Sequence, residues 1–497
     1  MTQTLGRNAT RGDPDGIRQA IDRFVESAKQ PALMEPGDES IAIVRENFVL
    51  TQQGSALVLQ AWDERRNLVR RITAVHAESR GRLELRFERF GKKTGTLLLV
   101  DLDRGARDRL ELRAGRLEFR EQFRRFLRRQ FPEYRVAELS TESNLEESLS
   151  PAYPRALLRQ GSSAWAAIGA SHDAQNAGGV LSFGLIWLDY LRRRDPDLTI
   201  RGLILLLPLG HEKTTCLRLR HLNTAVAEFR AFGSTEDGVE SALDLRDYGN
   251  VDTQLVPVRR RVPTAADAFI ASIAKNPAVE TLARPDGEIS LRVRGLEFAR
   301  TEGDRIVFRQ ETNAIATASN LAEIERIADR LSRARSHDTA EKLHPLYLKG
   351  RELWLESQVR AHMDEIDAAL FPAPVYSQTT TLAGPDRGLV DLLASDRHGR
   401  LAILELKASQ DIHLPLQALD YWIHVNWHLA RGEFESAGYF PDLRLRPESP
   451  RMLLVAPALE FHPSNERVLR FFSPEIEVQR IGVGAAWPRE LKIMFRM

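Results

Sequence analysis

Cysteine and lysine are both scarce in this sequence of 497 residues. Cys216 is the one cysteine, so no disulfide can form within the chain, and this composition fits the reducing environment of a cytoplasm. Lysine occupies nine positions, which leaves 61 of the 70 basic residues as arginine. A lysine inside a motif is therefore more informative here than in an average protein.

The sequence also lacks long apolar runs and an excess of charge of one sign. The longest apolar stretches, 180–191 and 202–210, are too short to cross a bilayer. The beginning of the sequence shows no signal-peptide pattern. Its 70 basic and 69 acidic side chains give a net charge of +1, which excludes histone-like basicity. We therefore expect a soluble cytoplasmic protein with no membrane partner, in which any nucleic-acid surface is a local patch.

The residues that are present predict several folded domains of the α/β class, α+β overall. Apolar residues make up 43% of the chain, enough for a core, and the length corresponds to about three domains. Apolar residues have helical spacing near the beginning, alternate with polar ones from about 40 to 102, and then follow a mixed helix and strand pattern. The predicted divisions are a β-rich domain at 1–103, an α/β domain at 104–262, a small α+β domain at 263–338 and a last domain at 339–497.

The last predicted domain contains a β-hairpin with an unusual charge pattern. Gly388–Leu393 reads as an apolar strand around Asp391, and Leu401–Lys407 reads as the return strand. Since strand side chains alternate between faces, Glu405 and Lys407 point to the same side. The strand is otherwise apolar and is expected to be central, where a charge costs several kcal/mol unless it is paired or binds a metal. Two acids and a lysine therefore converge at one place on a sheet.

This convergence suits metal-assisted hydrolysis of a phosphodiester. Asp391 and Glu405 would hold Mg²⁺ or Mn²⁺, since hard cations prefer oxygen ligands. Lys407 would orient the attacking water or stabilise the negative transition state. A helix is predicted just before the hairpin, and from it Glu356 would complete the metal shell; Glu352, one turn earlier, is an open alternative.

A second helix is predicted after the hairpin. Gln417 and Tyr421 are four residues apart on it and therefore share one helical face. That face would present an amide and a hydroxyl to a phosphate or a base.

Three short motifs follow one another in this region: Gly388-x-x-Asp391, Glu405-x-Lys407 and Gln417-x-x-x-Tyr421. Together they resemble the PD-(D/E)xK nuclease superfamily, and within it the RecB-type group. The stretch from Val390 to Lys407 is also similar to the hairpin of the mismatch endonuclease family EndoMS/NucS, in which a β-rich domain precedes the nuclease. The resemblance covers about 345–460, and Val390 stands where the family name has proline.

The resemblance implies a restriction-endonuclease-like mixed sheet flanked by helices. It implies a deoxyribonuclease that depends on Mg²⁺ or Mn²⁺, with a role in repair or genome defence, and it leaves room for a homodimer. The residue roles that it implies are a catalytic triad of Asp391, Glu405 and Lys407, a helical acid at Glu356, and ancillary helix residues at Gln417 and Tyr421.

A degenerate second copy of this domain is a further hypothesis. Two segments can be aligned with the last domain: Trp165–Ser171 with Ile403–Ser409, and Leu185–Leu191 with Leu416–Trp422. Ala167 and Gly169 would then stand where the last domain has Glu405 and Lys407. The gap between the two segments is seven residues longer in the first copy, so a coincidence of common α/β patterns remains the alternative.

Two other functions compete with the nuclease. One is a catalytically silent nuclease-like module that binds nucleic acid or a protein partner, and the other is a purely structural scaffold. Metal dependence separates the first from an enzyme, since an enzyme needs Mg²⁺ or Mn²⁺ and is inactivated by Lys407→Ala or Asp391→Ala. A binding module holds DNA in the presence of a chelator and tolerates both changes.

Overall fold

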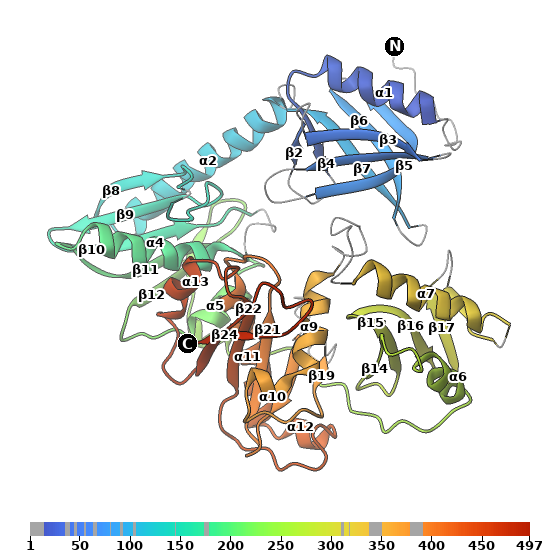
Figure 1. Cartoon of the computed structure of the whole chain (residues 1–497). Coiled ribbons are helices and arrows are strands. Elements are labelled where there is room, and N and C mark those ends of the chain that lie inside the picture. Colours follow the sequence, from blue (N-terminus) through green and yellow to red (C-terminus); the bar gives the residue numbers. More distant parts are fainter. Residues whose placement is uncertain are drawn as a thin grey trace. The chain divides into compact units, whose positions relative to one another are not determined.

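The computed structural model describes residues 14–497 except 35–39, 44–46, 54–55, 63–66, 80, 90–92, 103–105, 145, 173–177, 310–312, 318, 337–349 and 378–390 (Figure 1). The chain forms two compact units. The first comprises Met1–Gly115, Val307–Asn320 and Ala340–Lys349, and the second comprises Arg116–Ile306, Leu321–Thr339 and Gly350–Met497. The predicted α/β class is confirmed. None of the helices in the described ranges is long and apolar enough to cross a membrane.

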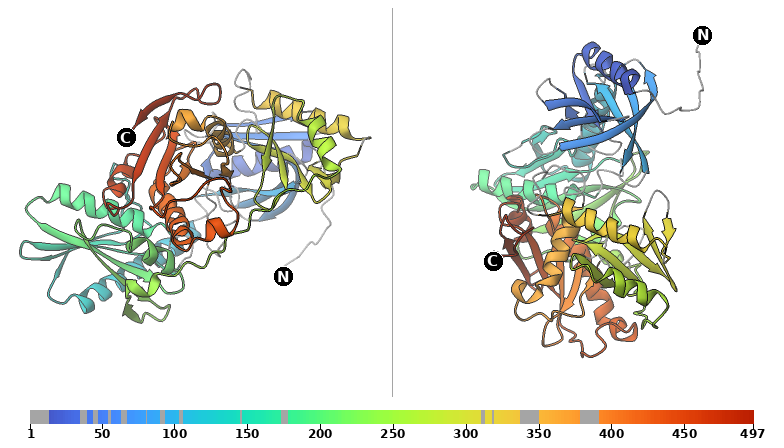
Figure 2. Two further views of the ribbon diagram at one scale, coloured as in Figure 1. Left: turned by 90° about the horizontal axis from the view of Figure 1, so that it is seen from below. Right: turned by 45° about the vertical axis from the view of Figure 1, so that its right-hand side comes forward.

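The first unit is built on an antiparallel sheet of seven strands in the order β2-β1-β7-β6-β5-β4-β3. Its strands are β1 Pro31–Met34, β2 Ile41–Ala42, β3 Phe48–Gln53, β4 Ala56–Trp62, β5 Asn67–Ser79, β6 Arg82–Arg89 and β7 Lys93–Asp101. Helix α1, Pro14–Ser27, covers one face of this sheet (Figure 2). Its Ile17, Ile21 and Phe24 belong to the same apolar core as the strands. Its first residue is proline, whose fixed φ suits the first helical position.

The second unit begins with the later turns of a long charged helix and a six-stranded mixed sheet in the order β13-β12-β11-β10-β9-β8. Its elements are α2 Ala106–Gln130, β8 Arg135–Ser140, β9 Arg155–Gln160, β10 Ser163–Gly169, α4 Val180–Arg194, β11 Thr199–Pro208, α5 Lys213–Leu219, β12 Glu228–Ser234, β13 Glu240–Ala242 and the 3-10 helix η2 Leu245–Tyr248.

The last part of the chain forms another six-stranded mixed sheet, in the order β19-β20-β21-β22-β23-β24. Its elements are α9 Arg351–Ala361, α10 Met363–Ile366, β19 Tyr376–Ser377, β20 Leu392–Ser395, β21 Leu401–Leu406, α11 Leu414–Ala430, α12 Glu433–Ser436, β22 Arg451–Pro457, α13 Ser464–Leu469, β23 Val478–Val483 and β24 Ile493–Arg496.

These two mixed sheets have the same topology. In each, the first three strands pair antiparallel, the third, fourth and fifth pair parallel, and the sixth is antiparallel again. A long helix, α4 or α11, connects the third strand to the fourth, and a short helix, α5 or α13, connects the fourth to the fifth. The shared topology favours a duplication over a coincidence of common patterns. One apolar core includes residues of both sheets and of α4 and α11.

A smaller five-stranded sheet lies between the two in the sequence, with its strands in chain order. Its elements are α6 Ala266–Ile273, β14 Val279–Ala283, β15 Ile289–Val293, β16 Leu296–Glu302, β17 Arg305–Arg309, β18 Asn313–Ile315 and α7 Leu321–Ala334. Strand β15 supplies one side chain to the surroundings of the candidate site.

Candidate active site

The predicted hairpin is formed by β20 and β21. Leu392 pairs with Leu404, and continuing this register by one residue sets Asp391 opposite Glu405. Every residue of β21 is buried, and the strand lies between β20 and β22, so the prediction of a central strand is confirmed. Gly399 in the connecting turn has φ +88°, a conformation that a residue with Cβ rarely adopts. The beginning of the predicted first strand, 388–390, lies outside the described residues.

Asp391 and Glu405 are adjacent carboxylates in a largely apolar setting. The backbone N–H of Leu406 donates to Asp391 Oδ2 at 2.8 Å, which fixes Asp391 against β21. Burial raises the pKa of Asp391 to about 7, against the lowering effect of that hydrogen bond. Burial and the charge of Asp391 raise the pKa of Glu405 well above its ordinary value. Without a cation, the pair therefore resists carrying two negative charges.

Lys407 follows β21 directly and completes the cluster. Its Nζ lies 3.5 Å from Glu405 Oε1 and 3.6 Å from Asp411 Oδ2. Burial disfavours the charged form of Lys407, but the surrounding carboxylates, Glu405 first among them, outweigh burial and raise its pKa. The structure thus brings the three residues of the predicted triad together, with the lysine held as an ammonium ion.

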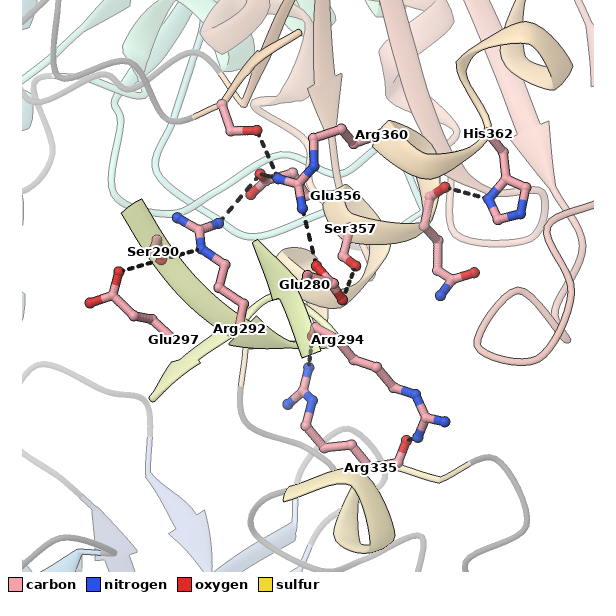
Figure 3. Close-up of polar contacts among 12 residues, drawn as sticks. Glu280, Ser290, Arg292, Arg294, Glu297, Arg335, Glu356, Ser357, Arg360 and His362 are labelled. Atoms are coloured by element: carbon pink, nitrogen blue, oxygen red, sulfur yellow. Dashed lines mark hydrogen bonds and ion pairs between the residues drawn. The ribbon is translucent and has the colours of Figure 1, made fainter. Parts of the chain in front are cut away.

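Glu356, the predicted helical acid, is instead engaged by two arginines. It lies on α9 and is 2% exposed. Its Oε1 is 3.3 Å from Arg360 Nη1 and 3.7 Å from Arg292 Nη1 of β15 (Figure 3). Burial raises the pKa of Glu356, and the two guanidinium groups oppose that rise. Arg360 also pairs with Glu280 at 3.1 Å, so this carboxylate belongs to a network that reaches into the five-stranded sheet.

Glu352, the open alternative, lies one turn earlier on α9 and is exposed. Its negative charge contributes to raising the pKa of Asp391, of Glu405 and of Lys407. Of these three pKa values, the charge of Glu356 contributes to raising that of Asp391. The charge of Glu352 is therefore felt across the whole cluster, whereas that of Glu356 is balanced by Arg292 and Arg360.

Gln417 and Tyr421 lie on α11, which packs against β21. Burial, together with the charges of Glu405 and Asp391, raises the pKa of the Tyr421 hydroxyl. Tyr421 is thus held neutral, as a hydrogen-bond donor. Within the described part of the chain, the buried Oε1 of Gln417 has no hydrogen-bond partner.

The two carboxylates offer an oxygen that suits a hard cation, but they do not by themselves make a complete set of metal ligands. Glu405 Oε2 is buried and has no hydrogen-bond partner among the residues described, an uncommon state for a carboxylate oxygen. No group of three or more histidine, cysteine, aspartate or glutamate side chains in the described ranges is arranged to hold a metal. Two carboxylates are nevertheless enough for Mg²⁺, which keeps several of its waters when bound to protein.

Arg292 and Arg360 are the residues that sequence reasoning missed. Arg360 is one turn after Glu356, a spacing that could have predicted an ion pair. Arg292 comes from another sheet, and no local pattern connects it with α9.

No protein-family model matches the chain, and no curated protein is similar to it. Among solved structures, it is similar to a repair endonuclease from Pyrococcus abyssi at 15% identity, over 41% of this chain and 77% of that one, with a TM-score of 0.19. It is also similar to an EndoMS–double-stranded DNA complex at 14% identity, over 41% and 77%, with a TM-score of 0.17. TM-scores this low establish neither the fold nor the function of this chain.

Proposed function

We propose that the chain is a metal-dependent nuclease that hydrolyses phosphodiester bonds in DNA, in repair or genome defence. The observation that supports this most directly is the pair of adjacent acids, Asp391 and Glu405, with an unpartnered oxygen beside the ammonium group of Lys407. An arrangement of this kind opposes folding by several kcal/mol unless a cation compensates it. A sheet that needed these positions for stability alone would be better served by apolar side chains.

Asp391 and Glu405 are the residues that would hold Mg²⁺ or Mn²⁺. A bound ion would polarise the phosphoryl group and lower the pKa of an attacking water. Glu352 is favoured over Glu356 as an additional acid, because it is exposed and its charge acts on all three residues of the triad, whereas Glu356 is paired with Arg292 and Arg360.

The chain's own residues would supply positioning and charge. Lys407 would donate a hydrogen bond to the attacking water or to a non-bridging oxygen, where it would stabilise the developing negative charge. Tyr421, held neutral, would donate a hydrogen bond from its hydroxyl to a phosphate oxygen. The amide of Gln417 would help to orient the same group from the adjacent turn of α11.

The test is cleavage of labelled single-stranded, duplex, mismatched and branched DNA with Mg²⁺ or Mn²⁺, and with a chelator. We expect metal-dependent cleavage that Lys407→Ala and Asp391→Ala each reduce by at least about 10²–10³-fold, the usual effect of removing an electrostatic stabiliser of the transition state. The matched control is Lys213→Ala, which removes an exposed lysine at the start of α5 that pairs with Asp252. This control should retain full activity.

The competing binding function makes the opposite prediction. DNA that stays bound in the chelator, with no cleavage under any metal condition and no effect of Asp391→Ala on binding, would replace the nuclease with a catalytically silent binding module.

A further inference from the structure

The two mixed sheets contact each other through equivalent backbone positions. Leu222, after α5, forms an isolated antiparallel bridge with Phe472, after α13. Leu222 precedes Glu228, where β12 begins, by the same number of residues as Phe472 precedes Val478, where β23 begins. The bridge therefore joins two residues that occupy equivalent positions in the two copies of the fold.

The hydrogen bonds that flank this bridge are also exchanged between the two copies. Asn223 N–H donates to Phe471 O at 2.8 Å, and Ser473 N–H donates to His221 O at 2.9 Å. Each bond is the counterpart of the other. Such a pattern is the mark of an isologous, two-fold contact.

Ion pairs between the helices also run in both directions, but through arginines that are not equivalent, because the register that matches Leu222 to Phe472 matches Arg218 to Val468. Arg218 of α5 binds Asp420 of α11, with its two nitrogens 2.7 and 2.6 Å from the carboxylate oxygens. In the reverse direction, Arg467 of α13 lies 3.8 Å from Asp189 of α4. Asp189 and Asp420 are the aligned positions of the two long helices.

The beginnings of the two long helices meet where a two-fold axis would pass. Ser182 Oγ of α4 and His413 Nδ1, just before α11, are 2.9 Å apart. Extending the alignment of Leu185–Leu191 with Leu416–Trp422 toward the N-terminus sets Ser182 on His413. Lys407, which follows β21, comes six residues before His413, so the candidate site lies close along the chain to this contact between the copies. The two mixed sheets and their connecting helices thus form an internal pseudo-dimer.

In the first sheet, the counterparts of the three triad positions are small and apolar. They are Ala156 for Asp391, Ala167 for Glu405 and Gly169 for Lys407. Ala156 and Ala167 pair across β9 and β10 in the register that sets Asp391 opposite Glu405. This half carries neither a metal ligand nor an ammonium group at these positions.

Aromatic side chains of α2 fill the space beside this counterpart. Phe119, Phe123 and Phe126 form a buried cluster with Ala156 and Ala167. A Cβ added at Gly169 would lie 3.0 Å from Phe123 Cδ2 and 3.4 Å from Phe119 Cζ, which leaves no room for a longer side chain. The site is therefore closed by packing as well as missing its functional groups.

From this pairing of one competent site with one closed counterpart we infer that the chain nicks duplex DNA, cutting one strand and sparing the other. The inference rests on the proposed function. The strands of a duplex are antiparallel, so a two-fold protein meets each strand with one of its equivalent sites. At the competent site, the water oxygen bonds to phosphorus, one ester P–O bond breaks, and the leaving oxygen is protonated to a hydroxyl. The other strand would meet the closed site, and its phosphodiester would stay intact.

The test uses supercoiled circular duplex DNA, with and without a single mismatch, and a limiting amount of the full chain. We expect nicked circles whose initial rate is proportional to protein concentration, with linear DNA appearing only after nicked circles have accumulated. Linear DNA formed without a lag would overturn the inference. The inference would also be overturned if an excess of the Asp391→Ala chain changed the product from linear DNA to nicked circles. That result would show that two chains normally cut together.

Single-stranded circular DNA separates this inference from the function on which it rests. Cleavage of single-stranded circles without cleavage of either duplex would overturn nicking and leave the nuclease standing. No cleavage of any circle with Mg²⁺ or Mn²⁺ would defeat the nuclease proposal itself, and nicking with it.

Discussion

The sheet β8–β13 and the sheet β19–β24 are two versions of one topology, completed by opposite chemistry. In the first, Ala156, Ala167 and Gly169 pack under phenylalanine side chains of α2. In the second, the same positions carry two acids and a lysine. Because the first sheet forms with small apolar residues, the fold does not require charges at these positions. The comparison teaches that the charged residues of the second sheet are a burden on stability, which the proposed function would explain.

The helices that precede the two sheets differ in the same way, one contributing apolar side chains and the other contributing acidic ones. The later turns of α2 supply Phe119 and Phe123 to an apolar core, whereas α9 supplies Glu352 and the buried Glu356. A buried acid needs compensation, and here Arg360 of the same helix and Arg292 of β15 provide it. The charged mixed sheet thus relies on an arginine from the neighbouring five-stranded sheet to balance a buried acid. The apolar mixed sheet is instead completed by phenylalanines of its own preceding helix.

The largest expected effect comes from introducing charge into the apolar version. Phe123 is fully buried and stacks on Phe126 with ring centroids 6.1 Å apart. Phe123→Glu would bury an unpaired carboxylate, and we expect the free energy of unfolding to fall by about 3–5 kcal/mol or more. Urea denaturation followed by far-UV circular dichroism measures this.

The control is Phe123→Leu, which keeps the site apolar and should cost about 1–2 kcal/mol. Equal losses in the two variants would contradict the description of this counterpart as a dry, closed core.

The hairpin was predictable from sequence because its signals are local. Strand periodicity gives the shared face of Glu405 and Lys407, and the turn at Gly399 gives the pairing with Asp391. The apolar spacing of 351–370 reads as one helix in the sequence, but the structure ends α9 at Ala361 and starts α10 at Met363. At this break, the ring Nδ1 of His362 lies 2.7 Å from the carbonyl oxygen of Gln358, a side-chain contact that apolar spacing does not reveal.

The partners of Glu356 could not be predicted, because Arg292 reaches it through tertiary packing. The two-fold relation was hidden for a similar reason. The aligned segments are short and are separated by unequal gaps, so sequence comparison left duplication and coincidence open. The exchanged contacts, such as the bridge from Leu222 to Phe472, are visible in the structure and leave no pattern in the sequence.

The second expected effect sharpens the comparison at the interface between the copies. The Arg218 side chain is 8% exposed and binds Asp420 with both nitrogens, so Arg218→Ala should lower the free energy of unfolding by about 2–3 kcal/mol. In the other copy, the Arg467 side chain is 22% exposed and binds Glu147 more closely than Asp189, so Arg467→Ala should cost about 1 kcal/mol or less.

A double-mutant cycle of Arg218 with Asp420 isolates the pair from other losses, such as the Arg218 hydrogen bond to the carbonyl of Gly178. A coupling energy near zero would show that this contact does not hold the two copies together.

The smallest expected effect is a pH dependence that the charged version alone should show. The pKa of Asp391 is raised to about 7, so the folded state binds a proton more tightly than the unfolded state, in which an aspartate has its ordinary value near 4. The stability that this proton confers is complete at low pH and is lost as the pH rises through about 7. In a chelator, the melting temperature should therefore fall between pH 6 and pH 8 by the equivalent of about 1 kcal/mol.

Asp391→Asn removes the titrating group, keeps an oxygen for the Leu406 N–H, and should flatten this slope relative to the unmodified chain. Saturating Mg²⁺ should flatten it as well, because the metal binds the deprotonated carboxylates and offsets their repulsion. Alanines at the corresponding positions of the first sheet do not titrate, so the difference between Asp391→Asn and the unmodified chain isolates the charged site from the pH response of the rest of the molecule. Identical slopes in the two proteins would mean that Asp391 is solvated well enough to ionise normally, and the cluster would then have no need of a cation.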